Sequence, residues 1–504
     1  MADGRQRGSG GTAGFVVLAA LSLLAACSAP SAEVERPPTE AAELAAVPLA
    51  AQRSPAGVVR VAYPDEPAGF LDLRHDDAAA ADLGAIWGLP MFRVDPHGQL
   101  AAGLVAHWET SSAPDGGWRI ELALREGRWS DGSAVTAADV VATLEALRAG
   151  PRAAELAPLT SVTAVDDRRV QLGFRMPYGR WWSLLDGVGV LPATVLAGSG
   201  PDAYADDIPV AGGWFSLGEH VPGLRTSFVA NPDGALGAPG VERLEVLVVP
   251  RYEAALGMLR EGEVDAVLGY LALNPVERAR RVDDVQAAAP IGGTTVTLAW
   301  RPAGPLGAPA AAPRRRAIAA ALDVSQLVEG LLGPSGAPAS SVVPGAAPGA
   351  TPSDDPVADV GEPVVVLPRW QEATAFTARA LQRDLRTAGG GMALVGEVTP
   401  DVVGLARSTG DGALVARRAG PWPTLVGSVH DPALALAGDA GGPGSAALSD
   451  ALAGAAEDAL VVPLYRIGVA HAWSDALIGV RPSAWPGLAF WDAGAWAVAV
   501  PGGP

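Results

Sequence analysis

The sequence contains no lysine and a single cysteine, Cys27, among its 504 residues. Without lysine the chain can neither form a Schiff base nor carry the phosphate-binding lysine of a P-loop, which excludes those enzymes and an ATPase. Without a second cysteine it can form no internal disulfide, so a large hydrophobic core must hold the fold together. A chain of this length can supply such a core, and its length predicts two or three lobes.

Positive charge is scarce as well. The formal net charge is −19 and the pI about 4.7, and the main basic cluster is the triplet Arg314–Arg316. This balance argues against a nucleic-acid partner. The six histidines are scattered, with no H-E-x-x-H motif, and no G-x-S-x-G elbow occurs. We therefore expect no metal site, no cofactor and no catalytic residues, which means that the protein is not an enzyme.

The N-terminus has the pattern of an export signal. Arg5 and Arg7 precede an apolar run, 15–26, that is too short for a bilayer span of about 20 residues but suits a signal peptide. The run ends in Leu24-Ala25-Ala26-Cys27, the pattern of a bacterial lipobox. We expect residues 1–27 to be a lipoprotein signal peptide with Cys27 as the acylated (palmitate-type) residue. The Ala/Pro/Glu-rich residues 28–57 are typical of a flexible tether.

The most informative segment is 124–141, Leu-Arg-Glu-Gly-Arg-Trp-Ser-Asp-Gly-Ser-Ala-Val-Thr-Ala-Ala-Asp-Val-Val. Its Ser-Asp-Gly sequence predicts a tight turn, and Thr136 with Asp139 approximates a capping box that starts a helix. Apolar residues then recur at helical spacing, at Val140, Leu144 and Leu147. Gly-Pro at 150–151 predicts the end of that helix.

This segment closely resembles the signature of the family 5 extracellular solute-binding proteins, the dipeptide, oligopeptide and nickel receptors of ABC importers. Further stretches resemble motifs of the same family: 87–109, with Trp87 in place of an acidic residue; 209–215, with Trp214 in place of a proline; 261–266; 315–323; and 463–465. The resemblance implies an α/β fold of the periplasmic-binding-protein type, class II-like. Such a fold has two lobes, a hinge, a ligand cleft between the lobes and an extra subdomain in the first lobe.

The order of these motifs predicts the division of the chain. We expect residues 58–250 plus 478–504 to form lobe 1 and residues 251–477 to form lobe 2. The crossings near 250 and 478 would then be the hinge.

The resemblance also suggests where a ligand lies. Trp87, Trp214 and Trp422 fall in or near motifs that line the cleft in the family, and indoles suit the walls of such a cleft. Packing in the core is the alternative for each of them. In peptide-binding members a carboxylate in lobe 2 holds the ligand's ammonium group; here Asp431-Pro432 matches the end of that motif, but Arg417 and Arg418 stand where acidic sequence is expected. A guanidinium favours a carboxylate or phosphate, so Arg417 and Asp431 are the expected polar contacts, with a surface ion pair as the alternative for the arginine.

The expected function is capture of an extracellular solute, a peptide or a peptide-like, carboxylate-bearing compound. The expected partners are the permease subunits of an ABC transporter with their ATPases, the small-molecule ligand, and the membrane through the lipid anchor. We expect a monomer on the extracytoplasmic face of the cell membrane. Two other classes stay open: a solute-binding scaffold that acts in signalling or surface interaction, and a surface hydrolase.

Overall fold

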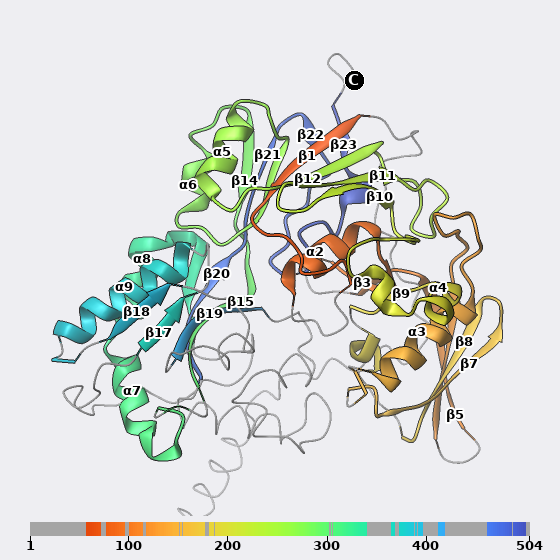
Figure 1. The fold of residues 1–504 in the computed structure, drawn as a ribbon, viewed down its shortest axis with the longest axis horizontal. Helices are drawn as coiled ribbons and strands as arrows, with labels where there is room; N and C mark the ends of the chain where they lie inside the picture. Colours follow the sequence, from red (N-terminus) through yellow and green to blue (C-terminus); the bar gives the residue numbers. More distant parts are fainter. Residues whose placement is uncertain are drawn as a thin grey trace, which may run out of the picture.

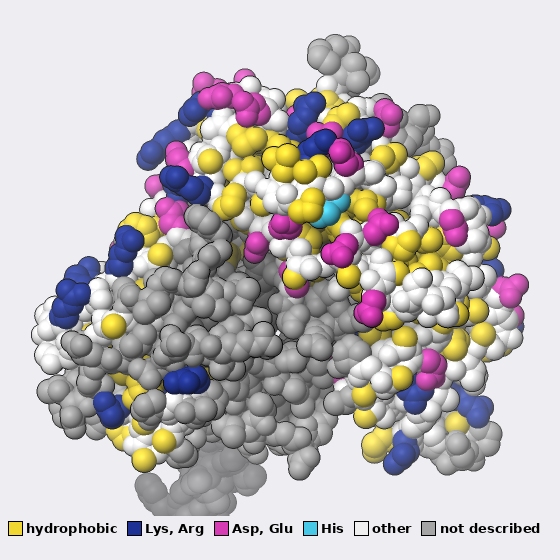
Figure 2. Space-filling view, in the orientation of Figure 1, with side chains coloured by type: hydrophobic (Ala, Val, Ile, Leu, Met, Phe, Trp, Pro, Cys, Tyr) yellow, Lys and Arg dark blue, Asp and Glu magenta, His cyan; other side chains and the backbone are white. Residues whose placement is uncertain are grey.

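The computed structural model describes residues 57–71, 77–95, 100–113, 117–150, 152–153, 155–176, 181–185, 187–301, 304, 306–339, 364–367, 372–387, 389–390, 392–396, 412–418, 461–485 and 487–499. Three larger sheets organise them (Figure 1). Across these residues, no helix has both the length and the apolar character needed to cross a membrane. Acidic side chains are interspersed with arginines over the described part of the face that Figure 2 shows.

The first sheet has seven strands and forms the upper part of the molecule in Figure 1. Its strands, in spatial order, are β10 (Phe215–Val221), β11 (Arg225–Ala230), β12 (Arg243–Val248), β1 (Val58–Tyr63), β13 (Ala266–Tyr270), β21 (Ala470–Ser474) and β14 (Val285–Ala288). The central strand β1 runs parallel to both β12 and β13, and the other pairs are antiparallel.

Helices cover both faces of this sheet, as expected for a sheet with a parallel centre. Helix α2 (Ala78–Trp87) packs on one face against Val59 and Val61, whereas α5 (Tyr252–Arg260) packs on the other against Ala62. The short helix α6 (Pro275–Ala279) follows β13.

A separate antiparallel sheet of four strands corresponds to the extra subdomain. Its strands, in spatial order, are β5 (Val105–Ser112), β6 (Trp118–Leu124), β8 (Arg169–Phe174) and β7 (Leu159–Asp166). Helix α3 (Ala137–Ala149) packs on it through Val140, Leu144 and Leu147, the three residues that the sequence places on one face. The capping box at its start also forms: the Asp139 carboxylate accepts a hydrogen bond from the Thr136 backbone N–H at 2.8 Å.

Smaller elements accompany these two sheets. They are the ribbons β2–β9 (Leu89–Pro90, Gly189–Val190), β3–β4 (Phe92–Val94, Leu100–Ala102) and β22–β23 (Leu477–Ile478, Ala497–Val498), helix α4 (Ala193–Gly198) and the 3₁₀ helices η1 (Trp181–Leu185), η2 (Pro201–Tyr204) and η6 (Ala493–Ala495).

The third sheet has six strands and lies to the left in Figure 1. In spatial order they are β16 (Gly336–Pro338), β20 (Val461–Gly468), β15 (Ile291–Trp300), β19 (Gly412–Arg418), β17 (Val364–Leu367) and β18 (Ala393–Gly396). The helices that share its core are α7 (Ala312–Ala320), α8 (Val324–Leu331) and α9 (Glu372–Thr387), with the 3₁₀ turns η3 (Pro309–Ala311) and η4 (Gly333–Ser335) beside them.

The chain passes between the first and third sheets at two points. It leaves β14 at Ala288 and enters β15 at Ile291, and it returns from β20 at Gly468 to β21 at Ala470. The expected crossings near 250 and 478 are therefore wrong in position: the chain stays in the first sheet through α5, β13, α6 and β14. The physical reason is β13, which is buried at all five positions and completes a parallel β12–α5–β13 unit beside β1.

An ion-pair bridge joins elements of the two sheets close to these crossings. Arg278, on α6, lies 2.7 Å from Glu253 of α5 and 2.9 Å from Glu372 of α9. Because α6 borders the first sheet and α9 the third, this arginine links the two halves of the molecule.

Candidate functional site

Trp87, one of the expected ligand contacts, lies at the end of α2 and is only 3% exposed. Its indole stacks on Tyr204, with ring centroids 5.3 Å apart and planes 12° from parallel. Its Nε1 is buried and has no hydrogen-bond partner. The surroundings are those of a core residue, and a ligand contact at Trp87 stays a prediction.

Trp214 is also held in the core of the first sheet, at 1% exposure. Its Nε1 donates a hydrogen bond to the Leu236 carbonyl at 3.3 Å, and the Arg93 guanidinium lies 3.9 Å from the ring centroid. The backbone N–H groups of Gly212 and Gly213 both donate to the Trp87 carbonyl. The structure thus joins the two tryptophan segments, while a ligand contact at Trp214 stays a prediction.

The remaining expected residues divide into two groups. Cys27, Trp422 and Asp431 lie outside the described residues. Arg417 lies in β19, in register with Thr295 of the neighbouring strand β15. Its position in the third sheet is the starting point for a candidate site.

A second arginine flanks the same threonine. Thr295 pairs with Arg417 on one side and with Arg466 of β20 on the other. Residues directly opposite one another in antiparallel strands share a face, and adjacent strands lie about 4.8 Å apart. We call the three positions Arg417, Thr295 and Arg466 the polar row.

The polar row belongs to the face of the third sheet that turns away from the helices. The neighbouring residues of β15, Val296 and Leu298, pack with α7, α8 and α9 in the core of this lobe. Since side chains alternate along a strand, Thr295 and Thr297 point the other way. Both are nevertheless fully buried, at 0% exposure.

Two polar atoms of this row are unsatisfied. The Thr295 hydroxyl and the Arg466 Nε are buried without a hydrogen-bond partner. Thr294 and Trp300 of β15 also carry such atoms, but they alternate with Thr295 and therefore belong to the opposite, helix-covered face. An unpaired buried polar group costs about 1–3 kcal/mol, so native proteins almost always supply a partner for it. A polar ligand over the row would be such a partner.

The charge of the row indicates the kind of ligand. Arg417 and Arg466 occupy register positions on either side of Thr295, so two residues of the same charge type flank one threonine. A carboxylate above Thr295 could accept hydrogen bonds from its hydroxyl and from the Arg466 guanidinium. Sequence reasoning identified Arg417 but missed Thr295 and Arg466, because only the register of three strands brings them together.

The described residues offer little for metal binding. They contain no group of three or more His, Cys, Asp or Glu side chains placed to hold a metal ion. Binding through hydrogen bonds and charge is the chemistry that the polar row supports.

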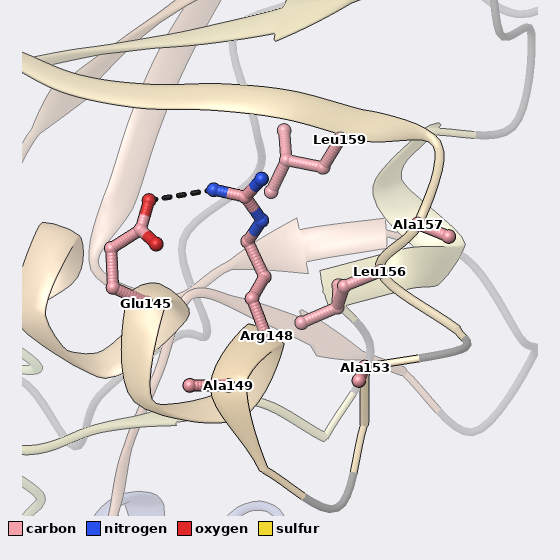
Figure 3. Close-up of a pocket in the computed structure, with 7 residues that line it drawn as sticks. All are labelled: Glu145, Arg148, Ala149, Ala153, Leu156, Ala157 and Leu159. Carbon is pink, nitrogen blue, oxygen red and sulfur yellow. Dashed lines mark hydrogen bonds and ion pairs between the residues drawn. The ribbon is translucent and has the colours of Figure 1, made fainter.

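A hollow beside α3 is a weaker candidate. It has a volume of about 290 Å³ and is lined mainly by alanine and leucine side chains (Figure 3). Its one charged pair, Arg148 and Glu145, is already joined at 2.7 Å. With both charges paired to each other, the hollow presents no free group to select a ligand.

Comparison with known proteins matches this chain to a family. A sequence model of the bacterial extracellular solute-binding proteins, family 5 (middle region), matches residues 99–375. A Brucella ovis protein named as an ABC transporter peptide-binding protein is 29% identical over 150 residues, which are 28% of each chain. The oligopeptide-binding protein AppA of Bacillus subtilis is 26% identical over 212 residues, which are 40% of this chain and 38% of AppA. The matched part thus spans well under half the length of these relatives.

Solved structures of similar fold cover almost the whole chain. The periplasmic EDTA-binding protein EppA superposes with a TM-score of 0.73 at 17% identity, over 91% of this chain and 99% of EppA. AppA of Bacillus subtilis, in complex with a nonapeptide, superposes with a TM-score of 0.73 at 18% identity, over 89% of this chain and all of AppA. The expected α/β fold of the periplasmic-binding-protein type is therefore confirmed, and the chain belongs to the bacterial extracellular solute-binding proteins of family 5.

Proposed function

We propose that this protein captures a carboxylate-bearing solute, a peptide or peptide-like compound, outside the cell and delivers it to the permease of an ABC importer. The observation that carries the proposal is the polar row, with Arg417 and Arg466 in register on the two sides of Thr295. The names of the Brucella and Bacillus relatives support import and a peptide ligand.

The ligand's carboxylate binds above Thr295 in this proposal. It accepts a hydrogen bond from the Thr295 hydroxyl, which is otherwise buried and unpaired, and from the Nε of Arg466. Arg417 contributes a second guanidinium from the opposite strand. A carboxylate between two guanidiniums gains charge-assisted hydrogen bonds, which are about twice as strong as neutral ones.

The other expected contacts complete the binding site. Trp422 supplies a flat apolar wall, and Asp431 holds the ligand's ammonium group. Trp87, which has an unpaired indole N–H, and Trp214 contribute from the first lobe. Closure would occur about the two chain crossings, 289–290 and 469, and would bury the ligand between the lobes.

A panel of peptides tests this site. The probes are tripeptides with a free C-terminal carboxylate and the same tripeptides with an amidated C-terminus, titrated into the full chain by calorimetry. We expect the free acids to bind at least about tenfold more tightly, since a charged hydrogen-bonded contact is worth about 1.5–3 kcal/mol. Arg466→Met should abolish this preference, because it removes the guanidinium and keeps much of the side-chain length.

Arg169→Met is the matched control, because Arg169 is a half-exposed arginine on the four-stranded subdomain. It should leave the preference unchanged. Equal binding of acid and amide by the wild type, or an unchanged preference in Arg466→Met, would rule out the polar row as the carboxylate site. Mass spectrometry of the peptides after incubation separates binding from hydrolysis.

We further propose that the mature protein is anchored by lipid at Cys27. The supporting observation is the lipobox sequence at the end of an export signal. Cys27→Ser should move the protein from the membrane fraction to the medium. An unprocessed N-terminus in the wild type, or release of the wild type itself, would contradict anchoring.

A further inference from the structure

Arg93 of β3 is a buried cation with few partners. Its side chain is 7% exposed, and its Nη1 is buried without a hydrogen-bond partner. The guanidinium lies over Trp214, with its central carbon 3.9 Å from the ring centroid. Burial lowers its pKa to about 9.

A second arginine contributes another unsatisfied donor to this region. Arg481 has a buried Nη2 without a partner, although its side chain as a whole is 42% exposed. It acts electrostatically on Arg93, and its guanidinium lies 4.7 Å from the ring of Trp491. The partial exposure of Arg481 places this side of the cluster at the protein surface.

The carboxylate in this cluster already has hydrogen-bond partners within the protein. Asp492 is 1% exposed and accepts hydrogen bonds from the Arg481 backbone N–H at 2.7 Å and from Trp496 Nε1 at 2.9 Å. Its Oδ2 also lies 3.6 Å from the Nε of Arg481. One negative charge therefore offsets two positive charges, so the cluster of Arg93, Arg481 and Asp492 keeps an excess positive charge.

We propose that Arg93 and Arg481 form an anion site that takes a carboxylate group, with the indole of Trp214 as its floor. The guanidinium fork matches the two oxygens of a carboxylate, and the free Nη atoms of the two arginines are the donors that would meet it. The floor is rigid: a Cβ on Gly494 would lie 2.3 Å from Cε2 of Trp214, so backbone and ring are in close contact.

This site is separate from the polar row. Arg93 and Arg481 lie beside the first sheet, whereas Arg417 and Arg466 lie in the third. The proposal goes beyond the proposed function and can be tested without a peptide.

Formate is the smallest carboxylate probe. We would titrate sodium formate into the full chain by calorimetry and follow thermal unfolding in formate and in chloride at equal ionic strength. We expect saturable formate binding that raises the Tm of the wild type, with chloride much less effective. Arg93→Met should lose at least tenfold in formate affinity at this site and show a smaller Tm increase than the wild type.

Arg481→Met is the second variant, since Arg481 is partly exposed and its loss is better tolerated by the fold. Its formate affinity should also fall at least tenfold, while Arg169→Met should respond to formate as the wild type does. An equal response to formate and chloride, or equal formate affinity in the wild type and in Arg481→Met, would overturn the site. Failure of the tripeptide experiment would leave this result unaffected, because that experiment is decided by Arg466→Met in the third sheet and this one by Arg93→Met and Arg481→Met beside the first.

Discussion

Gly468 faces the backbone of Ala289 so closely that a Cβ on Gly468 would lie 2.2 Å from the Ala289 carbonyl oxygen. The two residues belong to the two segments through which the chain passes between the sheets. A side chain at position 468 would therefore push the two crossing segments apart.

Gly468→Ala is expected to lower the free energy of unfolding by about 1–3 kcal/mol, because the new methyl group meets backbone atoms that cannot rotate away. Chemical denaturation measures the loss. Gly330→Ala is the matched control: this glycine lies in α8, and a Cβ added to it would have no atom within 4 Å, so the change should stabilise by about 0.5–1 kcal/mol. Equal effects of the two changes would contradict the close approach.

Thr295→Val should separate ligand binding from stability. Without ligand the hydroxyl is buried and unpaired, so its replacement by a methyl group should leave stability unchanged or raise it by about 1 kcal/mol. The affinity for a free-acid tripeptide should fall. Denaturation and calorimetry on the same preparation measure both quantities.

Thr377→Val is the control for that experiment. The Thr377 hydroxyl is equally buried, but it bonds to the Ala373 carbonyl at 2.8 Å and to the Tyr465 hydroxyl at 2.7 Å. Its removal should destabilise by about 1–3 kcal/mol. A loss of stability in Thr295→Val as large as that in Thr377→Val would mean that the Thr295 hydroxyl has a partner in the free protein.

His471 should make the protein less stable in mild acid. Burial lowers its pKa from 6.5 to about 4, while the hydrogen bond to the Ser483 carbonyl acts in the opposite direction. Between these values the unfolded chain binds the proton more strongly than the folded chain does, so this contribution is present above pH 6.5 and is lost as the pH falls toward 4. At pH 5 the loss is about 2 kcal/mol.

His471→Gln should remove that part of the pH dependence. Asp492 acts in the opposite sense, because burial raises its pKa to about 6 and it therefore adds stability as the pH falls below that value. The comparison must be between the variant and the wild type at pH 7 and at pH 5. A parallel pH dependence of the two proteins would contradict the role of His471.

Asp139 should be among the residues of α3 most sensitive to substitution. It is 6% exposed, and its carboxylate accepts hydrogen bonds from the backbone N–H groups of Thr136 and Ala193, each at 2.8 Å. Trp129 Nε1 donates to it as well, at 3.3 Å. Asp139→Ala leaves these donors unpaired and should destabilise by about 2–4 kcal/mol in a thermal or chemical melt.

Glu145→Ala provides the comparison on the same helix. Glu145 is half-exposed, and its ion pair with Arg148 is a surface contact, so its loss should change stability by no more than about 0.5 kcal/mol. A small effect of Asp139→Ala, similar to that of Glu145→Ala, would contradict the importance of the buried carboxylate.

Local features of the fold were predictable from the sequence where a single segment carries its own signal. The capping box of Thr136 and Asp139 and the apolar face of α3 are both confirmed. Sheet membership was not predictable in the same way. The apolar run of β13 fits either lobe. Its parallel pairing with β1, about 200 residues earlier in the chain, is what places it in the first sheet.

The candidate site could likewise be predicted only in part, because its residues come together through strand pairing. Arg417 stood out because it departs from a family motif, whereas Thr295 and Arg466 become relevant only through their register with it. The burial of Trp87 and Trp214 likewise depends on partners such as Tyr204 and Arg93, which the sequence alone does not place beside them.

The position of β21 in the first sheet has a consequence for the order of folding. This strand, residues 470–474, lies between β13 and β14, both of which precede it by some 180 residues or more. The gap between β13 and β14 can be filled only after the entire third sheet and its connections have been synthesised. Such long-range pairing slows folding. We therefore expect the nascent chain to remain without a complete first sheet until residues 470–474 have been synthesised.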